Sequence, residues 1–149
     1  MREIRIYLDN CVFNRPFDEQ TSIRIKLETE AKLYIQNKIF ENVIELVWSY
    51  ILEYENEQNP FIERKEAIKE WKKLAAVDIE ENEAILNKAK ELMRIGLKSK
   101  DALHIACAIE GKAEYFLSTD DKILKKGKHV REIKIIDPIE FVKILEAKC

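Results

Sequence analysis

The chain has 149 residues and a formal net charge of −2, because 26 basic side chains almost balance 28 acidic ones. Hydrophobic residues make up 46% of the sequence, which excludes a disordered chain, and the apolar runs are far too short to span a bilayer. The near-zero charge also argues against a general nucleic-acid coat, which needs a basic excess. We therefore expect one domain over residues 1–149 and no membrane association.

Cysteine and glycine usage narrows the class of protein further. The three cysteines, at positions 11, 107 and 149, include no close pair, which excludes a disulfide framework and a zinc-ribbon spacing. With only three glycines, the chain has neither a G-x-G-x-x-G motif nor a P-loop. The start of the chain lacks a signal-peptide pattern, so we expect a cytoplasmic protein.

The first part of the chain alternates short apolar runs with amphipathic segments. Apolar residues run together at 5–8, at 43–47 and, more briefly, at 77–79, which predicts three strands. A helical period predicts helices over 21–39, after the Ser49 cap, after Asn59-Pro60, and over 81–95 before Gly96.

The second part of the chain continues this alternation. A helix capped by Ser99 is expected over 101–110, and it is apolar almost all round, which is typical of a central helix. On this helix we interpret His104 as a packed residue. A strand at 115–118, a short helix, a strand at 134–136 and a C-terminal helix follow. The pattern predicts an α/β fold with a parallel sheet covered on both faces.

Acidic side chains follow several of the predicted strands. Asp9 comes directly after the first strand, Glu53 lies one helical turn beyond the second, and Asp120 and Asp121 follow the fourth. Asp101 opens the central helix. Since ligands of open parallel sheets bind beyond the carboxyl ends of the strands, these acids are candidate site residues.

Each acid also has a purely structural interpretation. Asp101, Asp120 and Asp121 fall in first turns, where a carboxylate is favoured by the helix dipole, and Asp9 suits a turn. Taken together, however, two carboxylates about 4 Å apart repel by about 4 kcal/mol at an effective dielectric of about 20. A cation relieves such repulsion, and oxygen ligands suit Mg²⁺ or Mn²⁺ better than zinc. Because Mg²⁺ binds phosphate oxygens, a phosphate ester is the expected substrate.

Four segments in order resemble the acidic motifs of PIN-domain ribonucleases. They are Tyr7-Leu8-Asp9-Asn10, Ser49-x-x-x-Glu53, Asp101-Ala102-Leu103-His104-Ile105-Ala106-x-Ala108 and Ser118-Thr119-Asp120-Asp121. The resemblance covers nearly the whole chain and implies a three-layer α/β/α sandwich around a parallel sheet. It also implies an Mg²⁺- or Mn²⁺-dependent endoribonuclease that hydrolyses RNA. Many family members of this size are toxins of toxin–antitoxin pairs (VapC-like toxins) and form homodimers, so an antitoxin protein and a second copy are expected partners.

Carried over by position, the resemblance assigns Asp9, Glu53, Asp101 and Asp121 as catalytic, metal-binding acids. The family's last motif, Thr-x-Asp, selects Asp121 and leaves Asp120 as a neighbour that can also reach the metal. One departure from the family pattern is Cys11, which stands where a Ser, Thr or Asn is common. A hydroxyl that could hold a water is therefore absent at that position.

A basic segment follows the last acids. Residues 122–134 contain six basic side chains and one acidic one. Its structural interpretation is a solvated helix face and loop, and its functional one is a phosphate-facing rim. We take Arg15, Lys122, Lys125 and Lys126 as candidates for contacting the RNA backbone without reading bases.

Two other functions stay open from the sequence. One is a PIN-like RNA- or protein-binding module with a weak or idle site, which the neutral charge and Cys11 permit. The other is an aspartyl phosphotransferase using Asp9, which ranks low because Cys11 replaces the second Asp of that chemistry. The aromatic residues Phe61 and Trp71, on a helical stripe, are expected to pack in the core or a dimer interface rather than to stack on RNA.

Overall fold

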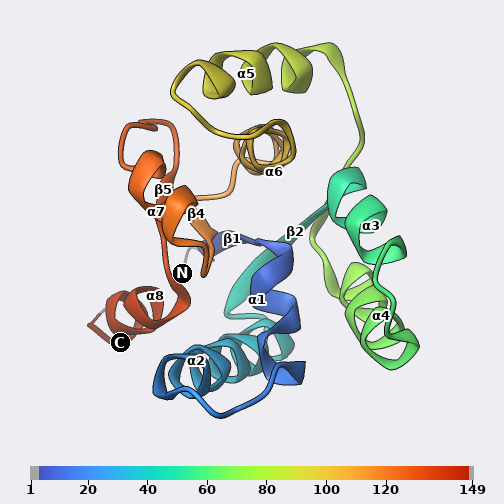
Figure 1. The fold of residues 1–149 in the computed structure, drawn as a ribbon, viewed down its shortest axis with the longest axis vertical. Coiled ribbons are helices and arrows are strands. Elements are labelled where there is room, and N and C mark those ends of the chain that lie inside the picture. Colours follow the sequence, from blue (N-terminus) through green and yellow to red (C-terminus); the bar gives the residue numbers. More distant parts are fainter. Residues whose placement is uncertain (1–3, 148–149) are drawn as a thin grey trace.

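A five-stranded parallel sheet lies at the centre of the computed structural model, which describes residues 4–147 (Figure 1). Its strand order is β3-β2-β1-β4-β5. The strands are β1 (Ile4–Leu8), β2 (Ile44–Ser49), β3 (Val77–Ile79), β4 (Tyr115–Leu117) and β5 (Lys134–Ile136). All five expected strands are present, and every neighbouring pair runs parallel.

Eight helices surround the sheet within the described residues. They are α1 (Asn10–Asn14), α2 (Ile23–Phe40), α3 (Tyr50–Glu57), α4 (Ile62–Lys69), α5 (Glu83–Arg94), α6 (Ser99–Glu110), α7 (Asp121–Gly127) and α8 (Pro138–Ala147), with 3₁₀ turns η1 (Arg15–Phe17) and η2 (Glu70–Leu74). Helix α6 lies over one face with α5 packed on its outer side, and α2 with α8 beside it lies over the other (Figure 1). The α/β/α sandwich expected from the sequence is thus confirmed.

The strands form the core because they are apolar on both faces. Ile6, Tyr7 and Leu8 of β1 are at most 1% exposed, as parallel strands between two helix layers require. Helix α6 is buried on almost every side, which confirms its expected central place. At the end of α5, Gly96 has φ = 100°, a backbone conformation that side chains other than glycine rarely adopt.

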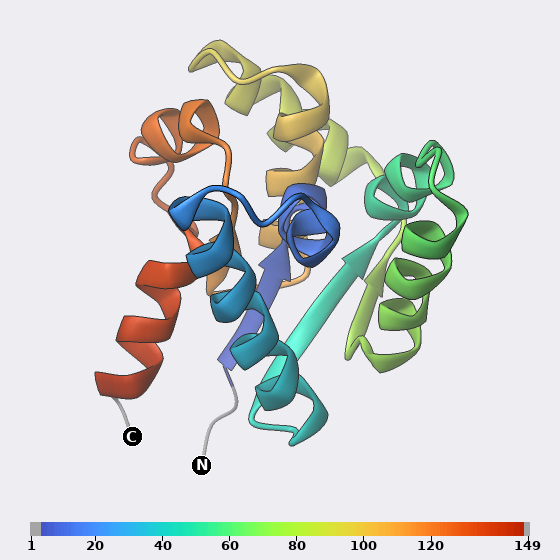
Figure 2. The ribbon, with the colours of Figure 1, turned by 60° about the horizontal axis from the view of Figure 1, so that its bottom comes forward.

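The carboxyl ends of the strands meet at one edge of the sheet. Figure 2 shows β1 running into α1, and beside it β2 running into α3. The backbone N–H of Asp9 donates to the carbonyl of Leu117 at 2.9 Å, which joins the exits of β1 and β4. Within residues 4–147, no helix is both long and apolar enough to cross a membrane.

Candidate metal centre

Asp9 lies at the exit of the central strand and is 6% exposed. Its Oδ1 accepts a hydrogen bond of 2.9 Å from the backbone N–H of Asn10, which caps α1. Its Oδ2 accepts one of 2.9 Å from the hydroxyl of Ser118, just beyond β4. Two neighbouring strand exits therefore fix the Asp9 carboxylate in place, which prepares it to bind a cation without reorganisation.

Asp101 and Asp120 approach this carboxylate from two helix starts. Asp101 is half-buried in the first turn of α6, and Asp120 caps α7 by accepting from the backbone N–H of Lys122 at 2.8 Å. Burial, followed by the neighbouring carboxylates of Asp9 and Asp120, raises the pKa of Asp101. Both acids line a cavity of about 40 Å³. The neighbouring carboxylates add to the effect of burial, and a cation would relieve their share of it.

Glu55 of α3 completes the group of acids from the β2 side. Its Oε1 is hydrogen-bonded to Nε2 of His104, and its Oε2 accepts from Nδ2 of Asn10 at 3.4 Å. One ligand atom from each of Asp9, Glu55 and His104 lies within 4.8 Å of the other two. Burial, the largest single influence, raises the pKa of Glu55, but His104, Lys100 and Asn10 together more than offset burial, so the pKa is lowered.

A buried chain of hydrogen bonds holds His104 in its place. Nδ1 of His104 is 2.6 Å from the hydroxyl of Tyr7, which is 2.6 Å from Oγ of Ser49. Ser49 in turn accepts from the backbone N–H of Leu52 and so caps α3. When Nε2 donates to Glu55, a neutral ring leaves Nδ1 to accept from Tyr7. The chain of hydrogen bonds therefore links β1, β2, α6 and α3 around the Glu55 carboxylate.

The structure turns Glu53 away from this group, although the resemblance assigns it the second acid. Glu53 Oε1 instead accepts from Nζ of Lys72 at 2.8 Å. Positions 53 and 55 point to different sides because two residues span about 200° of a helix. Glu55 follows the buried Ile51 and Leu52 by four and three positions, so it borders the inward face of α3. That helical spacing is the sequence signal that would have selected Glu55.

Asp121 also lies outside the group of acids. Its carboxylate accepts from both terminal nitrogens of Arg24, at 2.9 and 2.8 Å, and Arg24 lowers its pKa. The Arg24 guanidinium also donates to the carbonyl of Thr119. Asp120, the residue that caps α7, is the one that comes close to Asp101.

Comparison with known proteins agrees with the observed fold. A family model described as the PIN domain matches residues 6–129. The chain belongs to the PIN-domain family. No curated protein matches the sequence significantly.

Two solved structures share the PIN fold with this chain at low sequence identity. FitAcB from Neisseria gonorrhoeae is 15% identical, with a TM-score of 0.57, over 89% of this chain and 97% of that one. VapBC2 from Rickettsia felis, whose structure contains a DNA fragment from the promoter of the pair, is 13% identical, with a TM-score of 0.56. The match again covers 89% of this chain and 97% of that one. These likenesses support the architecture.

A hydroxyl does lie beside Asp9, although position 11 lacks one, because Ser118 supplies it from just beyond β4. Cys11 Sγ lies 3.4 Å from Asp9 Oδ2, while Ser118 Oγ donates to the same oxygen at 2.9 Å. Burial raises the pKa of the Cys11 thiol to about 12, so it is neutral at physiological pH. Cys11 therefore packs beside the site as a neutral group.

The four basic residues proposed to contact the RNA backbone differ in whether another group of the protein already binds their charge. Arg15 is bound to Glu28 at 2.8 Å and to Asp18 at 3.0 Å. Lys126 Nζ donates to the carbonyl of Gly96 at 2.6 Å. Lys122 and Lys125 are exposed, and Lys122 borders the small cavity beside Asp101 and Asp120. The two exposed lysines of α7 are thus better placed than Arg15 to meet a phosphate.

The donor set fits a hard divalent cation. Carboxylate oxygens of Asp9 and Glu55 lie within 4.8 Å of each other, and the carboxylates of Asp9, Asp120 and Glu55 are close enough to Asp101 to raise its pKa. Oxygen-rich sites of this kind suit Mg²⁺ and Mn²⁺, and a site built for zinc would carry more nitrogen or sulfur.

Proposed function

We propose that this PIN-domain protein is a metal-dependent endoribonuclease that hydrolyses RNA phosphodiester bonds with Mg²⁺ or Mn²⁺. The observation that carries the proposal is the closeness of Asp9 and Glu55 beyond β1 and β2, together with the influence of Asp9, Asp120 and Glu55 on the pKa of Asp101 at the start of α6. Membership of the PIN-domain family supports the same conclusion.

In this proposal each acid has a defined part in holding the ion. Asp9 is the fixed ligand, since its hydrogen bonds to Asn10 and Ser118 leave little freedom. Asp101 and Asp120 hold the ion from the side of α6 and α7, and Glu55 from the side of α3. A bound divalent ion supplies positive charge that offsets the negative charge developing on the scissile phosphate.

The RNA backbone approaches from the side of α7 in this proposal. Lys122 borders the cavity that Asp101 and Asp120 line, so its ammonium can bind a phosphate next to the acids. Lys125 extends the same exposed helix face, with Lys126 beside it. Such contacts position the RNA without reading its sequence.

The experiment that tests the proposal is cleavage of mixed RNA with Mn²⁺, with EDTA, and with Asp9→Asn. We expect cleavage with Mn²⁺ only, and its loss in the variant. Thermal unfolding with Mn²⁺ gives an independent measurement, because a ligand at 100 times its Kd adds about 2.7 kcal/mol of stability. Cleavage that survives EDTA overturns the mechanism. A protein without either response is an RNA- or protein-binding module instead.

We also propose that the protein acts in the cytoplasm as the toxin of a toxin–antitoxin pair and as a homodimer. The support is the family membership together with the match of the PIN fold over most of the chain. Expression of the chain alone should arrest growth, and co-expression with its neighbouring gene product should relieve the arrest. Light scattering on the purified protein measures whether two copies associate.

A further inference from the structure

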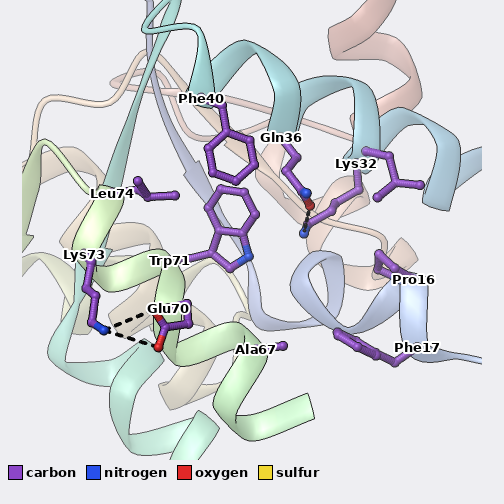
Figure 3. Close-up of a pocket in the computed structure, with 11 residues that line it drawn as sticks. Pro16, Phe17, Lys32, Gln36, Phe40, Ala67, Glu70, Trp71, Lys73 and Leu74 are labelled. Carbon is purple, nitrogen blue, oxygen red and sulfur yellow. Dashed lines mark hydrogen bonds and ion pairs between the residues drawn. The ribbon is translucent and has the colours of Figure 1, made fainter. Parts of the chain in front are cut away.

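An apolar groove lies between α2 and the segment formed by α4 and η2, and none of its lining residues belongs to the group of acids (Figure 3). Its volume is about 570 Å³. The indole of Trp71 forms part of the wall, and the ring of Phe40 lies 5.2 Å from it between centroids. A groove of this size is large enough for several side chains of a bound segment.

Large apolar side chains are left exposed along this groove. They are Phe17 at 42%, Leu33 at 38%, Phe40 at 54% and Leu74 at 43% exposed. Single exposed apolar residues are normal on a protein surface, but a contiguous set around one hollow marks an interaction site.

Lys32 places a buried positive charge in this apolar groove. The residue is 4% exposed, and its Nζ donates to Oε1 of Gln36 at 2.9 Å and lies 4.6 Å from the centroid of a Trp71 ring. Among residues 4–147, no carboxylate forms an ion pair with it. The groove's other charged residues, Glu70 and Lys73, pair with each other at 3.1 Å.

The Lys32 ammonium can donate further hydrogen bonds in this position. Lys32 has three N–H donors, and one of them reaches Gln36. Burial lowers its pKa to about 8, in keeping with an ammonium that no carboxylate faces. The Trp71 and Phe13 rings, 4.6 and 5.8 Å from Nζ, attract the ammonium but carry no opposite charge. Because proteins rarely bury a charge without a counter-charge, the arrangement points to a carboxylate supplied by a partner.

We propose that the groove docks a segment of a partner protein that has an apolar face and one Asp or Glu side chain paired with Lys32. The apolar lining matches the apolar face, and the buried ammonium matches the carboxylate. RNA does not fit this surface, because a phosphate chain needs exposed cations and Lys73 is already neutralised by Glu70. The inference does not depend on the proposed nuclease activity, because the groove shares no residue with the acids.

The test begins with selection of binders from a displayed library of random peptides of about four helical turns. The purified full chain is the bait. We expect the enriched peptides to share apolar positions at helical spacing and one conserved acid. Enrichment without a shared acid, or no enrichment at all, overturns the proposal.

Two variants then test the pairing. Lys32→Met should weaken the best peptide by at least about tenfold, and Lys73→Met, the matched control on the same groove, by much less. Changing the acid of the peptide to its amide should cost the same factor in the wild type and little in Lys32→Met. Equal losses in both proteins overturn the pairing with Lys32.

Further measurements distinguish peptide binding in the groove from binding of a second copy or of RNA there, and from effects on the nuclease site. Lys32→Met should fold normally and keep its thermal shift with Mn²⁺, because the acids are untouched. If Lys32→Met instead changes the oligomeric state in light scattering, a second copy occupies the groove and the proposed partner is wrong. Competition of RNA with the peptide would likewise overturn the proposal.

Discussion

Glu55 and His104, which are 49 positions apart in the sequence, are joined by a hydrogen bond between Oε1 and Nε2. The bond ties α3 to the central helix α6 beside Asp9. On the other side of the ring, Nδ1 is occupied by the hydroxyl of Tyr7. Both nitrogens of a buried imidazole are thus engaged, and the orientation of the Glu55 carboxylate depends on the ring.

This relationship predicts different effects for two acids on the same helix. Glu55→Gln should abolish or strongly reduce Mn²⁺ binding and RNA cleavage, because it removes a charge from the group of acids. Glu53→Gln should leave both nearly unchanged, because Glu53 is paired with Lys72. Isothermal titration with Mn²⁺ measures the first quantity. Equal losses in the two variants would show that Glu53 also serves the site.

A second matched pair lies at the start of α7. Asp120→Asn should weaken Mn²⁺ binding, since Asp120 is the acid near Asp101, whereas Asp121→Asn should leave it almost unaltered. The Asp121 variant loses a pair with Arg24 that lies at the surface, so the melting temperature should change little. Titration with Mn²⁺ and thermal unfolding of both variants check these outcomes. A loss of binding confined to Asp121→Asn would restore the assignment made from the resemblance.

The architecture could be predicted from the sequence because it depends on periodic patterns. The apolar runs of the strands and the all-round apolar α6 are local signals, and each produced the expected element. The positions of Asp9 and Asp101 could be predicted in the same way, because a strand exit and the first turn of a buried helix fix where their side chains point.

Which of two nearby acids faces the site, Glu53 or Glu55 and Asp120 or Asp121, was harder to predict from the sequence. A family motif gives an approximate position, but a shift of one residue in a turn or two in a helix changes the direction of a side chain completely. Asp121 has Arg24 as its partner, 97 positions earlier in the sequence, and nothing local indicates such a pair. The roles of His104 and Lys32 depend in the same way on distant contacts that only the folded chain provides.

His104 is expected to act as a positioning residue for Glu55. His104→Ala should lower Mn²⁺ affinity by about 10- to 100-fold, the usual effect of removing a group that orients a metal ligand. It should also reduce the free energy of unfolding by about 1–3 kcal/mol, because the buried Tyr7 hydroxyl loses a partner. Tyr7→Phe is the control, since it keeps the bond to Glu55 and should lower affinity less. Unchanged Mn²⁺ affinity in His104→Ala would contradict this role.

The buried Lys32 predicts an unusual dependence of stability on pH. Its pKa in the folded chain, about 8, lies below the ordinary value of 10.5, so between these values the unfolded chain binds more protons and stability rises with pH. The shift corresponds to about 3 kcal/mol. Lys32→Met should therefore be more stable than the wild type near neutral pH, and the difference should shrink as the pH approaches 10.5. Urea unfolding of both proteins at several pH values measures the difference in their free energies of unfolding. Groups that titrate alike in the two proteins contribute equally to both and drop out of this difference. A gap that stays constant with pH would mean that the fold does not disfavour the Lys32 ammonium.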